Sequence, residues 1–246
     1  MIIDALKYLV GLGSKEPTIQ MDTDGVSWWV APGRTPIRID PMMPAKLVGR
    51  TLGGLVNFVD DMANTNGEAL IIHVEAPEVV RIYSGLDKIY QTRKCFYKAE
   101  ARHSQFPFGE YMGIEKFIIS LQASFVMDDQ VRELLAYVGN LKSAASAKFT
   151  DNGVTQQATV RTGIAQVENK VVPNPVTLAP YRTFQEIDQP TSQYIFRMKR
   201  VEEQAKPQVA LHQCDDIAWG IDAVAGISNW LKYRIKTDGV SRTIIA

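Results

Sequence analysis

Residues 173–200 read PNPVTLAPYRTFQEIDQPTSQYIFRMKR and contain the clearest strand pattern of the C-terminal half. From 193 to 201 apolar and polar side chains alternate, and successive residues of a strand point to opposite faces. The pattern therefore predicts a strand with one face in a core, formed by Tyr194, Phe196 and Met198. The other face presents positive charge and carries Ile195, Arg197 and Lys199. Prolines at 173, 175 and 180 keep the approach extended.

The surrounding segments predict an antiparallel meander with strands near 154–162, 164–171, 193–201 and 208–213. Asp151-Asn152-Gly153 favours a tight hairpin, because Asn-Gly adopts the positive φ values that such turns need. A terminal helix that begins at Asp215 or Asp216 is expected to close the meander. Its predicted inner stripe consists of Ile217, Ile221, Val224, Ile227, Leu231 and Ile235. The tail 237–246 is expected either to fray or to dock on a neighbour.

Helical spacing recurs at several places before the meander. Apolar residues predict helices over 51–63, over 114–125 and after Asp128 or Asp129, with an aspartate as the cap of the last one. Gly53 and Gly54 are expected to allow close packing of another backbone. A short helix at 2–10 and strand patterns within 17–39, 69–76, 78–85 and 93–102 complete the N-terminal half. The predicted class is α+β, with mixed and antiparallel sheets and about four helices.

The domain organisation is predicted to change near the aromatic and proline-rich segment QFPFG at 105–109. Residues 1–104 would form a small α+β region. Residues 105–246 would form the helical pair, the meander and the C-terminal helix. Two domains and one continuous domain both remain open, since a chain of 246 residues can bury a sizeable core in either arrangement.

The composition excludes several classes of protein. Basic and acidic residues both number 27, so no global field attracts nucleic acid or an anionic membrane. Cys95 and Cys214 lie far apart and are interpreted as thiols in a reducing compartment. No stretch approaches the roughly 18 apolar residues of a membrane span, and residues 1–13 lack the features of a signal peptide. We expect a cytoplasmic protein with no membrane partner.

No residue pattern points to catalysis. The histidines are isolated in sequence and lie at His73, His103 and His212. His212 and Cys214 share a strand face, but no third group orients them as a nucleophile and base. The pair Asp60-Asp61 is interpreted as a solvated face and Asp128-Asp129 as a helix cap. We therefore predict no catalytic residue, no metal site and no cofactor.

A basic set with a neighbouring tyrosine is the best candidate for ligand binding. It consists of Arg161, Tyr181, Arg182, Arg197 and Lys199. If strands 154–162 and 193–201 are neighbours, these groups line one sheet face, where positive charge beside an aromatic ring suits a nucleotide or a single strand. The alternative is an ordinary solvated face paired with Glu168 and Glu186. Trp28 and Trp29 are candidate interface residues, or else two partly covered rings.

The C-terminal half resembles the YfdQ-like family of phage and prophage proteins, which has no assigned function. The resemblance rests on FPFGEYMGIEKFIISLQASF, DNGVTQQATVRTGIA, PNPVTLAPYRTFQEIDQPTSQYIFRMK and VALHQCDDIAWGIDAVAGISNWL. It covers about residues 104–236, and the N-terminal hundred residues resemble the family much less. The chain departs from the family pattern at 213–216, where the family has a more acidic, glycine-containing stretch. The resemblance implies a phage-encoded, non-structural, intracellular protein and transfers no catalytic residues.

Three functions are compatible with these observations. The first is a non-enzymatic, homo-oligomeric binding protein in the host cytoplasm, with nucleic acid, a nucleotide, or a host or phage protein as its partner. The second is an enzyme that acts on nucleotides or nucleic acid through His212 or the paired aspartates. The third is a self-assembling structural or scaffold protein.

Overall fold

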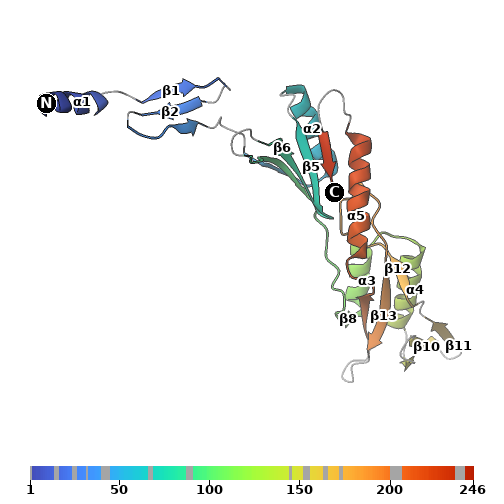
Figure 1. Ribbon diagram of the computed structural model, residues 1–246. Coiled ribbons are helices and arrows are strands. Elements are labelled where there is room, and N and C mark those ends of the chain that lie inside the picture. Colours follow the sequence, from blue (N-terminus) through green and yellow to red (C-terminus); the bar gives the residue numbers. More distant parts are fainter. Residues whose placement is uncertain are drawn as a thin grey trace. The chain divides into compact units, whose positions relative to one another are not determined.

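The computed structural model divides the chain into two compact units, Met1–Ala45 (unit 1) and Lys46–Ala246 (unit 2) (Figure 1). The described residues are 2–13, 17–23, 27–31, 33–39, 45–65, 69–86, 91–143, 146–151, 156–162, 166–171, 174–199, 207–235 and 242–246. This split lies elsewhere than the predicted boundary between 104 and 105, which stays a prediction. Residues 242–245 return to the sheet formed by residues 47–100.

Unit 1 contains a helix and a small antiparallel sheet. Helix α1 spans Ile2–Gly13, and the sheet has the order β1-β2-β3 with strands Thr18–Met21, Ser27–Val30 and Ile37–Ile39. Both Trp28 and Trp29 lie in β2 and are half-buried, as expected for two partly covered rings. The Trp28 indole N–H donates to Asp22 Oδ2 at 2.9 Å. Among the described residues of unit 1 only Ala31 is buried, so this unit has no core of its own.

The first half of unit 2 is a mixed five-stranded sheet with the order β15-β5-β6-β7-β4. Its strands are β4 (Leu47–Gly49), β5 (Leu70–Ala76), β6 (Val79–Ser84), β7 (Cys95–Glu100) and β15 (Arg242–Ile245). The outer strands β4 and β15 pair in parallel with β7 and β5, and the inner pairs are antiparallel. The predicted mixed sheet is thus confirmed, and Arg242–Ile245 of the C-terminal tail pair with a strand of their own chain.

Two helices cover one face of this sheet. Helices α2 (Leu52–Thr65) and α5 (Ala218–Arg234) share a core with the strands, in which Leu52, Leu55, Ile72, Ile227 and Leu231 are fully buried. Four of the six residues in the predicted stripe of the terminal helix belong to the core, namely Val224, Ile227, Leu231 and Ile235. Ile217 and Ile221 are 72% and 73% exposed. The helix packs against the sheet through its later turns. The periodicity of apolar residues shows which side of a helix is apolar, but not which of its turns pack against another element.

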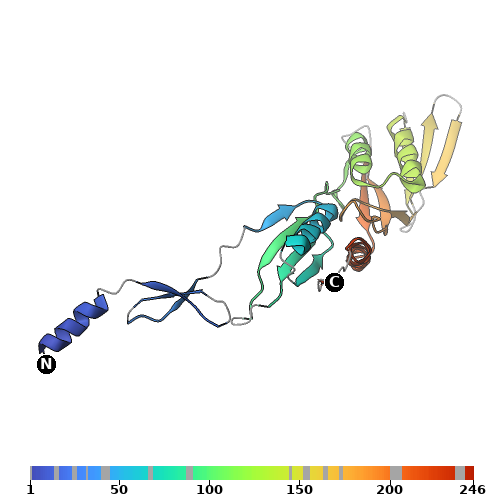
Figure 2. The same ribbon diagram turned by 90° about the horizontal axis from the view of Figure 1, so that it is seen from above.

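The second half of unit 2 is an antiparallel sheet with the order β12-β13-β14-β8. Its strands are β12 (Val176–Leu178), β13 (Ser192–Lys199), β14 (Gln208–Gln213) and β8 (Met112–Gly113). Helices α3 (Ile114–Ser124) and α4 (Asp129–Ser143) lie beside each other against it, shown in yellow-green in Figure 2. The Val131 N–H donates to Asp128 Oδ1 at 2.8 Å, which confirms the aspartate cap.

A separate antiparallel sheet has the order β11-β10-β9, with strands Gln166–Val171, Gln156–Thr162 and Ser146–Asp151. The predicted antiparallel pairings within each hairpin are confirmed. The four strands of the predicted meander do not form one sheet, because β10 and β11 pair with β9 while β13 and β14 pair with β12 and β8. The α+β class is confirmed, and the described residues form five helices.

The segment 180–189 connects the two cores of unit 2. The Tyr181 N–H donates to the Ser124 carbonyl at the end of α3 (2.8 Å), and the Thr183 hydroxyl donates to the Pro77 carbonyl in the β5–β6 turn. Phe184 is 1% exposed and lies in the core under α2 and α5. At the start of α2 the Gly53 N–H donates to Glu186 Oε1 at 3.2 Å. One irregular segment is therefore anchored in both halves of the unit.

The close approach near the start of α2 involves a side chain and not a backbone. A Cβ atom added at Gly49 would overlap the ring and hydroxyl of Tyr97, and one at Gly54 would lie 3.0 Å from the same hydroxyl. A Cβ at Gly53 would meet nothing within 4 Å. The expected close packing of another backbone at Gly53 and Gly54 is therefore not seen. Gly54 does make a close contact, but with the Tyr97 side chain.

Replacing Gly49 with alanine is expected to lower the free energy of unfolding by about 1–3 kcal/mol, because the new methyl group overpacks against Tyr97. Gly53→Ala is the matched control and is expected to gain about 0.5–1 kcal/mol, since glycine is unfavourable within a helix. Urea unfolding followed by circular dichroism measures both changes. Equal effects of the two substitutions would contradict the close approach of Tyr97 to Gly49.

Candidate functional site

Strand β13 separates a buried face from an open face, as the alternation predicted. Tyr194, Phe196 and Met198 are buried, whereas Arg197 is half-buried and Lys199 is exposed. Phe196 meets the rings of Phe117 and Tyr137 edge-on under the helices. Arg197 and Lys199 alternate with these buried residues and therefore lie on the opposite face of the sheet, which α3 and α4 do not cover.

The neighbouring strands bring an imidazole and a phenol ring to the same face. In the register of β13 and β14, His212 lies opposite Ile195 and Ala210 lies opposite Arg197. Tyr111 precedes β8 and lies next in this row, since Met112 pairs with Val209. The Lys199 ammonium is 5.8 Å from the centre of the Tyr111 ring, and the rings of Tyr111 and His212 are 6.1 Å apart. We name Tyr111, Ile195, Arg197, Lys199 and His212 the open sheet face.

The predicted basic set does not come together as a whole. Arg161 lies in β10, which belongs to a different sheet from β13, so the condition that the two strands are neighbours is not met. Tyr181 and Arg182 follow β12 in the connecting segment and lie at a cleft instead. The suggested partner Glu186 accepts a hydrogen bond from Gly53, and Glu168 lies in β11, in the sheet of Arg161.

Arg182 is an interior residue with an aromatic neighbour. Its guanidinium lies 4.1 Å from the centre of the Trp219 ring, and its pKa is lowered by burial. It donates to the Pro190 carbonyl at 3.0 Å and to the Tyr194 hydroxyl at 3.4 Å. Burial also raises the pKa of Tyr194 to about 12, so this phenol stays neutral and accepts that hydrogen bond. Arg182 therefore does not contribute to the open sheet face.

The aromatic residue of the open sheet face was missed by the sequence reasoning. Tyr181 lies next to Arg182 in the chain, whereas Tyr111 is brought to Lys199 by the pairing of β8 with β14. A strand of two residues gives no alternation to read, so only the unusual run of aromatic residues between 106 and 111 marked this region in the sequence.

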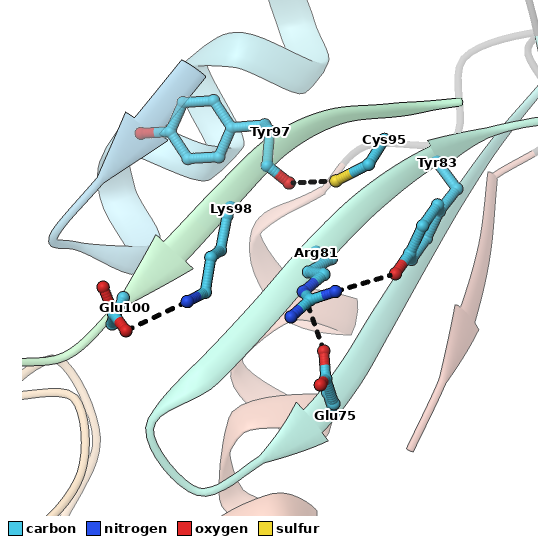
Figure 3. A network of polar contacts seen from close by, with 7 residues as sticks. All are labelled: Glu75, Arg81, Tyr83, Cys95, Tyr97, Lys98 and Glu100. Atoms are coloured by element: carbon cyan, nitrogen blue, oxygen red, sulfur yellow. Dashed lines mark hydrogen bonds and ion pairs between the residues drawn. The ribbon is translucent and has the colours of Figure 1, made fainter. Parts of the chain in front are cut away.

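The other sheet of unit 2 presents polar side chains that pair among themselves (Figure 3). Arg81 Nε forms an ion pair with Glu75 at 2.8 Å, and Lys98 donates to Glu100 at 2.9 Å. Arg50 also contacts Glu100 at 2.9 Å. The hydrogen bonds from Lys98 and Arg50 lower the pKa of Glu100, which keeps its carboxylate charged. Because its charges compensate one another, this face is a weaker candidate for an anionic ligand.

The residues considered for catalysis form no arrangement that activates a nucleophile. The Cys214 thiol donates to the backbone carbonyl of His212 at 3.8 Å rather than to its ring. Asp60 forms an ion pair with Arg242 at 3.6 Å, so it binds a strand of its own chain. No group of three or more His, Cys, Asp or Glu side chains among the described residues has the geometry of a metal site.

No protein-family model, curated protein or solved structure matches this chain. The resemblance to the YfdQ-like family therefore stays a prediction. Within the part of the chain that the structure describes, no helix is long and apolar enough to cross a membrane.

The two faces of β13 are expected to respond oppositely to truncation. Phe196→Ala should lower the free energy of unfolding by about 3–5 kcal/mol, because it removes a fully buried ring. Lys199→Ala should change it by less than about 0.5 kcal/mol, as exposed substitutions usually do. Guanidinium chloride unfolding of both variants measures the difference. A loss of similar size in the two variants would show that the faces are wrongly assigned.

Proposed function

We propose that this chain is a phage-encoded, non-enzymatic, homo-oligomeric protein of the host cytoplasm that binds single-stranded nucleic acid or nucleotides. The observation that supports the proposal is the open sheet face, where two cations and two aromatic rings gather on adjacent strands. The resemblance of residues 104–236 to phage proteins supports the phage origin.

The chemistry of the open sheet face suits a single strand better than a duplex. Arg197 and Lys199 lie two residues apart on a strand, about 7 Å along the backbone, and both can contact successive phosphates. Tyr111, 40% exposed, offers a ring on which a base can stack. An open sheet that combines aromatic rings with basic side chains is a general solution for unstacked bases. The chain has no net charge, so binding depends on this local patch.

The double variant Arg197→Ala, Lys199→Ala is expected to bind a labelled single-stranded oligonucleotide at least about tenfold more weakly, a loss of about 1.4 kcal/mol. The parent's affinity should fall steeply as salt rises from about 50 to 200 mM, because phosphate contacts release counterions. Fluorescence anisotropy measures both effects. Lys116→Ala with Arg132→Ala is the matched control, since it removes two positive charges from exposed positions of α3 and α4.

Two further outcomes decide the proposal. Equal losses in the double variant and its control would mean that only long-range charge matters, and a parent without salt-dependent binding would reject nucleic acid as the ligand. In the same assay Tyr111→Ala should weaken binding while leaving the salt dependence unchanged, because stacking on a neutral ring releases no counterions.

Unit 1 supports the homo-oligomeric part of the proposal. On α1 the side chains of Ile2, Ile3, Leu6, Tyr8, Leu9 and Val10 are 55–78% exposed. A helix of 12 residues is marginal by itself in water, and so is a small sheet without a covered face. An exposed apolar helix of this kind therefore needs a partner.

A second copy of the chain supplies a suitable partner surface. A groove of about 440 Å³ on unit 1 is lined by apolar side chains that include Met21, Trp28, Val30 and Pro36. The side chains of α1 are exposed within their own chain, so its own helix does not fill this groove. Apolar side chains of one copy and the apolar groove of another are complementary, and their burial is favourable by about 25 cal/mol per Å².

Leu6→Glu with Leu9→Glu is expected to shift the protein from an oligomer to the 27.5-kDa monomer, because the charges make burial of α1 unfavourable. Sedimentation velocity measures the mass. Ile119→Glu is the matched control, since Ile119 is an equally exposed apolar residue, 60%, on α3 of unit 2. If the unmodified protein is monomeric at tens of micromolar, a range in which even weak interfaces form, the proposal is rejected. Closed particles in negative stain would instead favour the scaffold protein.

A further inference from the structure

A cleft of about 640 Å³ lies in unit 2 and is separate from the open sheet face. Its lining comes mainly from the end of β7 and the segment that follows it, from residues 180–182 and from the first turn of α5. The lining residues that matter below are Glu78, Glu100, His103, Tyr181, Arg182 and Trp219. A volume between about 300 and 1,000 Å³ is typical of small-molecule sites.

Arg182 is a buried cation whose partners are all neutral. It is only 8% exposed and donates through its terminal nitrogens to Pro190, Ser192 and Tyr194. Its Nε is buried and has no hydrogen-bond acceptor among the described residues. Asp215 attracts it electrostatically, but no described carboxylate forms an ion pair with it within 4.0 Å. Asp215 therefore compensates this buried charge only from beyond 4.0 Å, and an anion in the cleft would stabilise it further.

The segment that follows β7 contributes a second polar group to the lining. His103 is half-buried, and its Nδ1 is buried without a hydrogen-bond partner among the residues that the structure describes. The two carboxylates that line the cleft differ in how far their negative charge is compensated. Glu100 is bound by Lys98 and Arg50, which compensate its charge, whereas Glu78 is exposed. Arg102 also lines the cleft, whereas Asp215, which attracts Arg182, is not among the lining residues.

We propose that this cleft binds a small organic anion, whose carboxylate or phosphate lies between Arg182 and His103. A guanidinium and an imidazole are both donors suited to oxyanions. The aromatic side chains of Tyr181 and Phe106 provide an apolar surface for the rest of the ligand. The inference is independent of nucleic-acid binding, because none of these residues belongs to the open sheet face.

The three histidines of the chain report on the cleft separately from the other surfaces. Inorganic phosphate and benzoate are titrated separately into the full-length protein, and the imidazole signals are followed by NMR. We expect the signals of His103 to move while those of His73 and His212 stay, and the anion that moves them distinguishes phosphate from carboxylate recognition. If phosphate moves only His212, the anion binds at the open sheet face and the cleft proposal is overturned. If neither anion moves His103, it is overturned as well.

Variants then locate the bound anion. His103→Gln and Arg182→Gln are each expected to weaken binding of the anion that moves the His103 signals, phosphate or benzoate, by about tenfold. The loss of a hydrogen bond to a charged group has an effect of this size. Arg132→Gln, which removes an arginine that is 62% exposed on α4, should leave the affinity unchanged. Since Arg182 also holds Pro190 and Ser192, its variant is compared only if its thermal unfolding matches the parent, and otherwise His103→Gln decides. Parent-like affinity in His103→Gln would overturn the proposal.

Discussion

The segment 180–189 is the connection on which the architecture of unit 2 depends. It is irregular and largely buried, so its backbone groups must find partners inside the protein. Gln189 provides several of them: its side-chain oxygen accepts from the N–H groups of Arg182 and Thr183, and its amide donates to the carbonyls of Phe184 and Ile187. Phe184 then enters one core while Pro180 bridges to Phe125 at the edge of the other. The relative position of the two cores follows from these contacts.

The two sheets of unit 2 differ in how the charged side chains on their surfaces are arranged. On the five-stranded sheet each of Arg81 and Lys98 contacts a carboxylate within 3 Å. On the four-stranded sheet the Lys199 ammonium lies over a tyrosine ring. Surface ion pairs contribute little to stability, about 0–1 kcal/mol, so their main effect here is to neutralise one face. The chain as a whole has no net charge, so attraction of an anion would depend on a local arrangement of charges.

In unit 1 the notable feature is the lack of buried apolar surface, and not the arrangement of charges. Its three strands and its helix bring many apolar side chains to the surface, and Ala31 is the one residue buried among those described there. Small units of this kind rarely hold together without a partner, a disulfide or a metal, because the surface that they bury is too small. The proposed assembly with another copy would supply the missing core.

Several local elements of this protein and the faces of strand β13 could be predicted from the sequence alone. The alternation in β13, the stripe of α2 and the cap of α4 were all readable, because each depends on residues within a few positions of one another. Only the tertiary structure decided which strands are neighbours. It placed β10 apart from β13, brought Tyr111 and not Tyr181 to Lys199, turned Arg182 inward over Trp219, and joined the C-terminal strand to β5. These pairings link residues that are distant in the chain, and they depend on competing burial and hydrogen bonding across the whole unit. A single sequence carries no local trace of that competition.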